Sequence, residues 1–260
     1  MHNGRIINGF EIRMEGRSDI GRVRGNNEDY LDWDMERGLA VLADGVGGSN
    51  AGEVASRMAV TTLLEQIPPL SRGSATAHCA HRLREAIEHA NRRIHESAQY
   101  APFLGMSTTL TALWVCGRQV ILAHVGDSRI YRLRNGALTQ VTVDHSFVQE
   151  MVDSGIMTVE EALNSTRRHL ITRALGLKES VRVDIQVSGV RAGDRYLLCS
   201  DGLSDMVDEP TLASLLMDGE GALAVLVDTL IEHANQRGGR DNIAALVVAI
   251  DQADDVNFEN

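Results

Sequence analysis

The residues of this sequence that could do chemistry are aspartates, and the clearest one stands where an apolar run ends. Leu39–Ala43 is entirely apolar, which is typical of a buried strand, and Asp44-Gly45 follows at once. A carboxylate at the end of a core strand is held rigidly, and glycine lets the backbone turn tightly and expose its carbonyl. Carboxylate and carbonyl oxygens are the ligands that Mg²⁺ and Mn²⁺ prefer. The segment alone predicts either a metal site or a strand-to-helix turn in which Asp44 is a local cap.

The same design is repeated along the chain, and the repetition favours the metal interpretation. Further carboxylates stand at the ends of strand patterns, most of them close to glycine: Glu28 and Asp29 before Tyr30, Asp127 after Gly126, Asp201 before Gly202, and Asp241 ahead of Ile243. Acidic residues scattered over a surface would not keep appearing at such places. We therefore expect these carboxylates to converge on one site.

Eight segments, taken in order, resemble the metal-dependent protein phosphatase family, protein phosphatase 2C, in its bacterial branch. The segments are Ser18–Asp29, Ala43–Ser56, Met106–Leu110, His124–Tyr131, Asp144–Ser146, Ile171–Gly176, Leu197–Met206 and Gly238–Ile243. Together the matches extend from about Phe10 to Ile250, which is nearly the whole chain. A single motif of this kind would be weak, but eight in the family's order are specific.

The resemblance implies a site for two metal ions, Mn²⁺ or Mg²⁺, with a third ion beside them. Carried over motif by motif, Asp44 would bridge the two ions, Gly45 would offer its carbonyl, and Glu28 would bind mainly through water. Asp201 and Asp241 would hold the first ion from the opposite sheet. Supporting roles fall to the remaining matches: Asp29 and Asn242 would orient the ligands, and Asp127 would share the third ion with Asp201.

Two further positions concern the substrate. Arg24 stands where the family has its phosphate-binding arginine, and a guanidinium can hold a phosphate dianion through two parallel hydrogen bonds. The alternative is that Arg24 only balances the nearby carboxylates. Val46 departs from the family, in which many members carry histidine or methionine after the Asp-Gly pair. Valine cannot donate a proton to the leaving oxygen, so the general acid is left open.

Hydrophobic periodicity predicts helices near both ends of the chain, with most of the strands between them. Helices are expected at 50–67, 75–98, 210–218 and 222–236, with Ser49 or Asn50 capping the first. Strands are expected at 10–16, 39–43, 108–115, 119–125, 129–134, 137–141, 181–187, 195–200 and 243–250. This order and the resemblance together predict an α+β fold. It would be a four-layer α/β/β/α sandwich of two antiparallel β-sheets, each flanked by a pair of helices.

The same patterns divide the chain into segments. Residues 1–9 are expected to be a loose or edge segment, 10–250 a protein phosphatase 2C-like catalytic domain, and 251–260 an acidic tail. Within the domain, about 144–182 lacks strand signals and contains a capping box, Thr158-x-x-Glu161. Its place between strands, beside the expected site, predicts a flap insertion.

Composition limits the partners and the location. The 260 residues carry a net charge of −11, which argues against nucleic acid or an anionic membrane as a partner. No apolar run approaches the roughly 18 residues of a membrane span, and the start lacks the apolar core of a signal peptide. Cys79, Cys116 and Cys199 lie in apolar patterns without CxxC spacing, so we expect reduced core residues. We expect a cytoplasmic monomer.

From the residues and the resemblance together, we expect a Mn²⁺- or Mg²⁺-dependent phosphatase that removes phosphate from serine and threonine of proteins. Its partners would be phosphoproteins, among them a cognate serine/threonine kinase and that kinase's substrates. The alternative is a weak or inactive phosphoprotein-binding regulator of the same fold, for which loss of Asp44, Asp201 or Asp241 would be the sign; all three are present. A P-loop ATPase is disfavoured because no lysine follows the glycines after Asp44.

Overall fold

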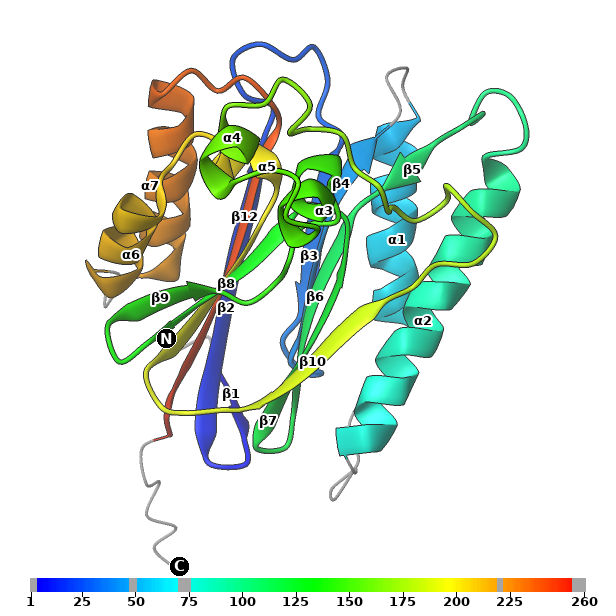
Figure 1. Ribbon diagram of the computed structural model, residues 1–260. Helices are drawn as coiled ribbons and strands as arrows, with labels where there is room; N and C mark the ends of the chain where they lie inside the picture. The colour runs from blue at the N-terminus through cyan, green and yellow to red at the C-terminus, as the bar shows by residue number, and fades with distance from the viewer. Residues whose placement is uncertain (1–3, 47–50, 70–75, 219–221, 254–260) are drawn as a thin grey trace, which may run out of the picture.

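The computed structural model describes residues 4–46, 51–69, 76–218 and 222–253, and places two antiparallel sheets face to face (Figure 1). The first sheet has the strand order β1-β2-β12-β11-β8-β9. Its strands are β1 (Arg5–Ile7), β2 (Phe10–Asp19), β8 (Arg129–Arg134), β9 (Ala137–Gln140), β11 (Asp194–Cys199) and β12 (Ile243–Gln252). The last strand, β12, lies between β2 and β11 and therefore pairs with the start of the chain on one side and with β11 on the other.

The second sheet is built from the central part of the chain. Its order is β10-β7-β6-β4-β3, with β5 paired to β4. The strands are β3 (Asp29–Asp34), β4 (Leu39–Val46), β5 (Ser107–Thr108), β6 (Leu110–Cys116), β7 (Gln119–Val125) and β10 (Asp184–Gly189). Every pairing in both sheets is antiparallel, as expected from the sequence and the family resemblance.

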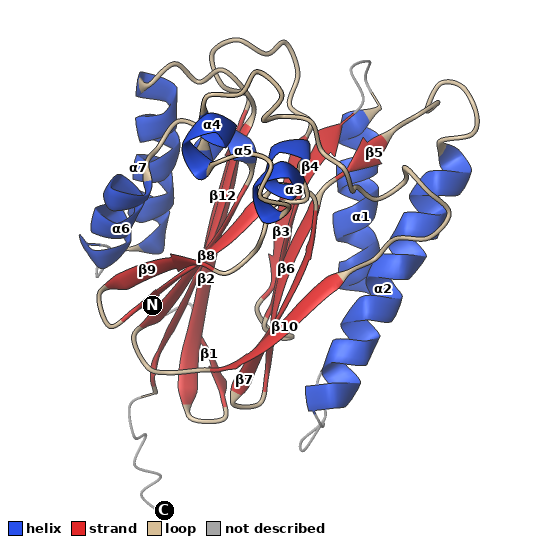
Figure 2. Cartoon of the chain, viewed as in Figure 1, coloured by secondary structure: helices blue, strands red, loops and turns tan. Residues whose placement is uncertain are grey.

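Helices cover the outer face of each sheet, which gives four layers (Figure 2). α1 (Gly52–Gln66) and α2 (Thr76–Ser97) pack on the second sheet, and α6 (Glu209–Asp218) and α7 (Leu223–Gln236) pack on the first. A third apolar core, which includes Leu42, Leu113 and Leu246, fills the space between the two sheets. The predicted four-layer α/β/β/α sandwich is therefore confirmed.

The first helix pair forms for the reasons that the sequence suggests, apart from its start. α1 buries Ala55, Ala59 and Leu63 on one face, and its C-cap is Ile67, directly before Pro68-Pro69. Its N-cap is Ala51, with no side-chain hydrogen bond; Ser49 and Asn50, the predicted caps, lie outside the described residues. α1 and α2 run antiparallel, side by side (Figure 1).

One predicted strand is interrupted where the site lies. The expected strand at 108–115 is divided into β5, which pairs with β4 at Gly45 and Val46, and β6, which pairs with β4 from Leu39 to Leu42. Thr109 lies at the break and bonds with both backbone groups of Asp44: its N–H donates to the carbonyl, and its Oγ1 accepts from the amide. The break between β5 and β6 therefore places Thr109 where it can bond to both backbone groups of Asp44.

The structure describes all of residues 144–182, and this segment contains short helices and no β-strand, as its lack of strand signals predicts. α3 (Phe147–Asp153) begins at the N-cap Ser146, and α4 (Val159–Leu163) begins at Thr158 with the predicted capping box to Glu161. The two ends of the segment are joined, because Ser146 pairs with Ile171 in an isolated bridge. The strand expected at 181–187 begins only at Asp184.

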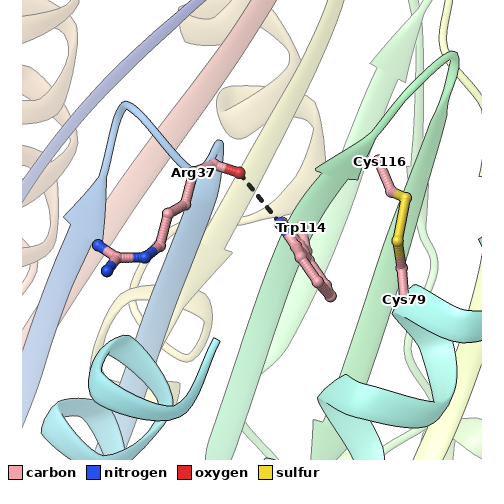
Figure 3. Close-up of a disulfide and its surroundings, with 4 residues drawn as sticks. All are labelled: Arg37, Cys79, Trp114 and Cys116. Carbon is pink, nitrogen blue, oxygen red and sulfur yellow. Dashed lines mark hydrogen bonds between the residues drawn. A yellow bond between two sulfur atoms is a disulfide. The ribbon is translucent and has the colours of Figure 1, made fainter. Parts of the chain in front are cut away.

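The prediction of three reduced cysteines is wrong for two of them. Cys79 of α2 and Cys116 at the end of β6 form a disulfide (Figure 3), while Cys199 is free and buried. Sequence spacing could not show this pairing, because it depends on the first turn of α2 lying close to the end of β6. Nearby, the Trp114 indole donates to the carbonyl of Arg37 at 3.0 Å. Among the described residues, no helix has the length and apolar character that a membrane crossing needs.

Candidate metal centre

The predicted carboxylates meet at one end of the sandwich, where strands of both sheets stop. Asp44 lies near the end of β4, directly across from Asp29, the first residue of β3. Leu39–Ala43 is fully buried, so the strand that carries Asp44 is anchored in the core along its length. The apolar run that predicted a rigid platform for this carboxylate is thus confirmed as one.

Glycines allow three segments to approach one another beside Asp44. A Cβ on Gly45 would overlap the backbone of Gly52, the first residue of α1. A Cβ on Gly52 would in turn overlap the carboxylate of Glu28, which therefore lies against the start of α1. The Gly45 amide also donates to the Glu28 carbonyl at 3.1 Å. A carboxylate is favourable at this helix end because the helix dipole is positive there.

The first sheet contributes the facing half of the centre. Asp201 begins the short helix α5 (Asp201–Ser204), directly after β11, and Asp241 lies just before β12. Gly202 has no room for a side chain, because a Cβ would overlap the carbonyl of Asn242. The Asn242 side chain accepts from the Glu28 amide at 2.9 Å and donates to the carbonyls of Ile20 and Asn26. Asn242 therefore joins the Glu28 loop to the Asp241 loop.

Asp29 of the second sheet is bonded to Ser200, next to β11 of the first sheet, behind the cluster. Only 6% of Asp29 is exposed, and its Oδ2 accepts a 2.7 Å hydrogen bond from Ser200, whose Oγ also accepts from the amide of Ala244. Its other oxygen, Oδ1, is buried and has no hydrogen-bond partner among the described residues. A buried carboxylate oxygen without a donor is costly, so the fold alone does not account for it.

Asp127 is positioned by a turn that is bonded to the Asp44 strand. The next residue, Ser128, shares a 2.7 Å hydrogen bond with Thr109, and the same threonine hydroxyl accepts from the Asp44 amide at 3.0 Å. Asp127 and Asp44 are thus connected through two hydroxyls, neither of which sequence reasoning had identified. The segment Met106–Leu110 had matched the family, but its spacing did not show what Thr109 contacts.

These side chains line one cleft of about 500 Å³. Every predicted ligand is present, together with Arg24 and Val46: Glu28, Asp44, Gly45, Asp127, Asp201 and Asp241. Asn242 also lines the cleft, whereas Asp29 lies behind it. Arg24 donates from its guanidinium to Asp241 at 2.6 Å, so it is close to the centre but paired.

The cleft also contains residues that the sequence analysis missed. Arg168 and His169 reach it from the 144–182 segment, and Asp205 reaches it from the end of α5. The His169 Nδ1 lies 3.8 Å from Asp201 and 3.5 Å from Asp205, and Arg168 lies 3.5 Å from Asp205. A basic pair within a segment without strand signals was the only available sign of this contact.

Burial and mutual repulsion raise the pKa of Asp29, Asp44 and Asp127. Burial raises the pKa of Asp29 to about 8, against a hydrogen bond from Ser200, and the charges of Asp201 and Asp241 add to the rise. Burial also raises the pKa of Asp44 well above its usual value, with the charge of Asp29 next in importance. For Asp127, burial and then the charge of Asp201 raise the pKa to about 7. The cations beside the cluster therefore do not offset the repulsion and burial at these three carboxyls.

The donor set fits hard divalent cations such as Mn²⁺ and Mg²⁺. It offers carboxylates, a tight glycine carbonyl and one orphaned buried oxygen, all of them oxygen ligands. Among the described residues, only His169, Asp201 and Asp205 bring three ligand atoms within 4.8 Å of one another. Asp44, Asp201 and Asp241 line the same cleft, but they do not bring three oxygens within 4.8 Å of one another.

Comparison with known proteins agrees with this geometry. A sequence model described as protein phosphatase 2C matches residues 16–247. The chain belongs to this family. The serine/threonine protein phosphatase PstP of Mycobacterium tuberculosis is 43% identical over 240 residues, which are 92% of this chain and 45% of PstP. The chain thus spans less than half the length of that relative.

Two further relatives match over most of their length. The serine/threonine phosphatase stp of Listeria monocytogenes is 39% identical over 244 residues, 92% of this chain and 96% of stp. A crystal structure of the PstP catalytic domain in complex with two manganese ions has a TM-score of 0.82 and 41% identity. It covers 93% of this chain and 99% of that chain. The family resemblance drawn from the eight motifs is confirmed.

Proposed function

We propose that this chain is a Mn²⁺- or Mg²⁺-dependent protein phosphatase that hydrolyses phosphoserine and phosphothreonine on proteins. The observation that carries the proposal is the cleft itself, in which carboxylates from both sheets surround a space without enough positive charge of its own. The names of the relatives and the two manganese ions reported for the PstP domain support the same activity.

In the proposed site, Asp44, the Gly45 carbonyl and Glu28 would hold two ions from the second sheet, with Asp44 as the shared ligand and Glu28 acting mainly through water. Asp201 and Asp241 would hold one of these ions from the facing sheet. When bound, such a pair of ions supplies charge neutralisation and lowers the pKa of a shared water toward neutrality. The chain's own contribution is rigidity: Asn242 ties the Glu28 loop to the Asp241 loop, and Asp29 is braced by Ser200. Asp127 would share a third ion with Asp201.

Arg24 is the proposed phosphate-binding residue. Its guanidinium lies at the cleft and bonds to Asp241, a proposed ligand. A cation on Asp241 would neutralise that carboxylate and leave the guanidinium free to hold a phosphate dianion. Val46 lies on the cleft wall, 36% exposed, and offers no proton to the leaving oxygen.

The rest of the sequence-based interpretation is proposed on the same basis. Residues 10–250 would form the catalytic domain, and 144–182 would act as a flap that selects protein substrates, a role supported by Arg168 and His169 reaching the cleft. The proposed partners are a cognate serine/threonine kinase and its target proteins. We propose that the chain acts on them as a monomer. A cytoplasmic location follows from substrates made with ATP, although the Cys79–Cys116 disulfide removes the cysteine argument for it.

The test is phosphate release from a phosphothreonine peptide by protein first treated with a chelator. We expect no release until Mn²⁺ is added, and none with Mn²⁺ in the variant Asp44→Asn. Asp32→Asn, on the neighbouring strand β3 and outside the cleft, is the matched control and should behave like the unchanged protein. Full activity in chelator would overturn the proposal. Nothing in the cleft favours the inactive regulator, since Asp44, Asp201 and Asp241 all line it.

A further inference from the structure

A histidine at the start of the 144–182 segment holds the turn that carries Asp127. His145 is 6% exposed and bonds to Gly126 in both directions. Its backbone N–H donates to the Gly126 carbonyl at 2.7 Å, and its ring nitrogen Nδ1 accepts from the Gly126 N–H at 3.0 Å. A single residue therefore satisfies both polar backbone groups of Gly126: its backbone N–H bonds to the carbonyl and its side chain to the N–H.

The hydrogen bonds determine which ring nitrogen carries the proton. A backbone N–H can only donate, and the Gly126 N–H has no other acceptor among the described residues, so Nδ1 must be unprotonated. The proton then lies on Nε2, which faces the Asp184 carboxylate at 3.2 Å. Arg173 lies 2.9 Å from the same Nε2 but has its own acceptors, the Asp184 carboxylate at 3.0 Å and the Arg182 carbonyl at 3.2 Å.

The ring is fixed on its face as well as at its edges. His124 of β7 packs against it with ring centroids 4.4 Å apart, and His124 is itself 3% exposed. On the other side of the segment, the Thr172 amide donates to the His145 carbonyl at 2.8 Å. His145 is thus held by His124 of the sheet and by Thr172 of the 144–182 segment, so its position is well determined.

The turn itself leaves little freedom. Gly126 has φ of +112°, a conformation that residues with side chains avoid, and a Cβ there would lie 2.6 Å from the Thr109 side chain. On the far side of Asp127, Ser128 is bonded to Thr109. The backbone of Asp127 is therefore held before and after by separate anchors, His145 on Gly126 and Thr109 on Ser128.

We propose that His145 is a positioning residue for Asp127: by holding Gly126, it aims the Asp127 carboxylate into the cleft and links the 144–182 segment to metal binding there. The inference rests on the proposed function, because it assigns His145 a role at the third ion. It predicts that the acceptor at Nδ1 matters more than the contact of Nε2 with Asp184. A side chain that only fills space would show no such difference.

Two substitutions separate the two ring nitrogens. In H145N the amide oxygen can take the place of Nδ1 and accept from Gly126, whereas in H145Q the longer side chain reaches toward Asp184 and leaves Gly126 without an acceptor. H145A, which removes both contacts without adding bulk, is a second variant with the same expectation as H145Q. His89→Gln on α2, outside the cleft, is the matched control. The melting temperature of each variant is measured first.

The first readout needs no turnover. In metal-free protein, hydrogen–deuterium exchange of the peptide spanning Gly126 should be faster in H145Q and H145A than in H145N, which should resemble the unchanged chain. Calorimetry with Mn²⁺ should retain the tight binding step in all variants. The Mn²⁺ concentration for half-maximal phosphopeptide hydrolysis should rise about 10-fold or more in H145Q and H145A, the usual effect of losing a partner behind a metal ligand.

A double-mutant cycle decides whether His145 acts through Asp127. In an Asp127→Ala background, H145Q should cause no further change in the Mn²⁺ dependence. Equal effects in both backgrounds, or H145Q and H145N with the same exchange and the same Mn²⁺ dependence, would overturn the inference. An unchanged chain without phosphopeptide activity would instead count against the proposed function, and exchange and calorimetry would still decide the role of His145.

Discussion

Aspartates at two places in the sandwich meet opposite conditions. Asp194 begins β11 and is 1% exposed, and Arg134 binds both of its carboxylate oxygens, at 2.7 and 2.6 Å, while the Arg191 amide donates to one of them. Asp29 and Asp44 are equally part of the sheets, yet among the described residues no cation of the chain pairs with either. The fold neutralises the first charge by itself.

The difference teaches that the cluster is not a by-product of folding. A sheet of this chain can bury an aspartate and supply its arginine, as β8 and β11 do. Where the chain brings several carboxylates together and leaves a buried oxygen of Asp29 without a donor, protons or cations from solvent must neutralise them. A divalent cation is the partner that fits oxygen ligands of this kind.

The largest expected effects come from two substitutions, Asp44→Asn in the cluster and Arg134→Ala beside Asp194. Asp44→Asn should lower phosphopeptide turnover by about 10³-fold or more, because a bridging ligand is lost. In chelator, however, the same variant should melt at a higher temperature than the unchanged chain, since the amide cannot take on the charge that burial and the neighbouring carboxylates disfavour at Asp44. Arg134→Ala should do the reverse, with turnover retained and about 3 kcal/mol of stability lost through the unpaired Asp194.

Calorimetric melting in chelator, beside phosphate release with Mn²⁺, measures both halves of this prediction. Arg13→Ala, which breaks the more exposed Arg13–Asp251 pair of the same sheet, is the control and should cost no more than about 1 kcal/mol. If Asp44→Asn and Arg134→Ala both lowered the melting temperature in chelator, the two regions would not differ as described.

A smaller effect is expected at Arg24, which sharpens the comparison because this arginine does pair with a carboxylate of the cluster. Arg24→Ala should weaken kcat/KM for a phosphopeptide by about 1.5–3 kcal/mol, the range for hydrogen bonds to charged groups. The loss should appear in KM at least as much as in kcat. Arg22→Ala is the nearby control. An unchanged kcat/KM would make Arg24 a counter-charge for Asp241, comparable to Arg134 beside Asp194.

The smallest effect concerns pH. In the folded metal-free chain the pKa of Asp29 is about 8 and that of Asp127 about 7, whereas an unfolded aspartate loses its proton near pH 4. Between these values the folded chain holds more protons than the unfolded one, so the free energy of unfolding falls as pH rises. Melting in chelator should therefore drop by a few degrees from pH 5.5 to 8.

Mn²⁺ should remove that drop, because a bound ion replaces the protons and favours the ionised carboxylates. Asp29→Asn should also flatten the pH dependence in chelator, whereas Asp194→Asn should not. A melting temperature that rose with pH in chelator would show that these carboxyls are not held protonated by the fold.

Much of the site could be predicted because each candidate ligand stands in a short segment with a recognisable pattern. An apolar run followed by Asp-Gly predicts a carboxylate near the end of a buried strand, so Asp44 and Asp201 could be identified from a few residues each, although β4 continues through Asp44-Gly45 to Val46. The order of helices and strands was equally local, since it depends on periodicity within single elements. Motifs in the family's order then brought these separate signals to one cleft.

The parts that could not be predicted depend on contacts between distant segments. The bonds of Thr109 to Asp44 and of Ser200 to Asp29 join residues 65 and 171 positions apart. His169 reaches the cleft from a segment with weak patterns, and Cys79 meets Cys116 only because the start of α2 lies close to the end of β6. Neither spacing nor composition reports which surfaces of two elements touch, and the break between β5 and β6 has the same origin.

Calorimetric titration of chelator-treated protein with Mn²⁺ near pH 6.5, repeated in two buffers of different ionisation heat, tests the central claim most directly. Because the carboxylates of this cluster must lose protons to bind an ion, we predict at least two bound ions per chain, with protons released on binding. Asp44→Asn should lose most of that binding, and Asp194→Asn should keep it. Absence of Mn²⁺ binding by the unchanged chain, or equal binding by Asp44→Asn, would contradict the account.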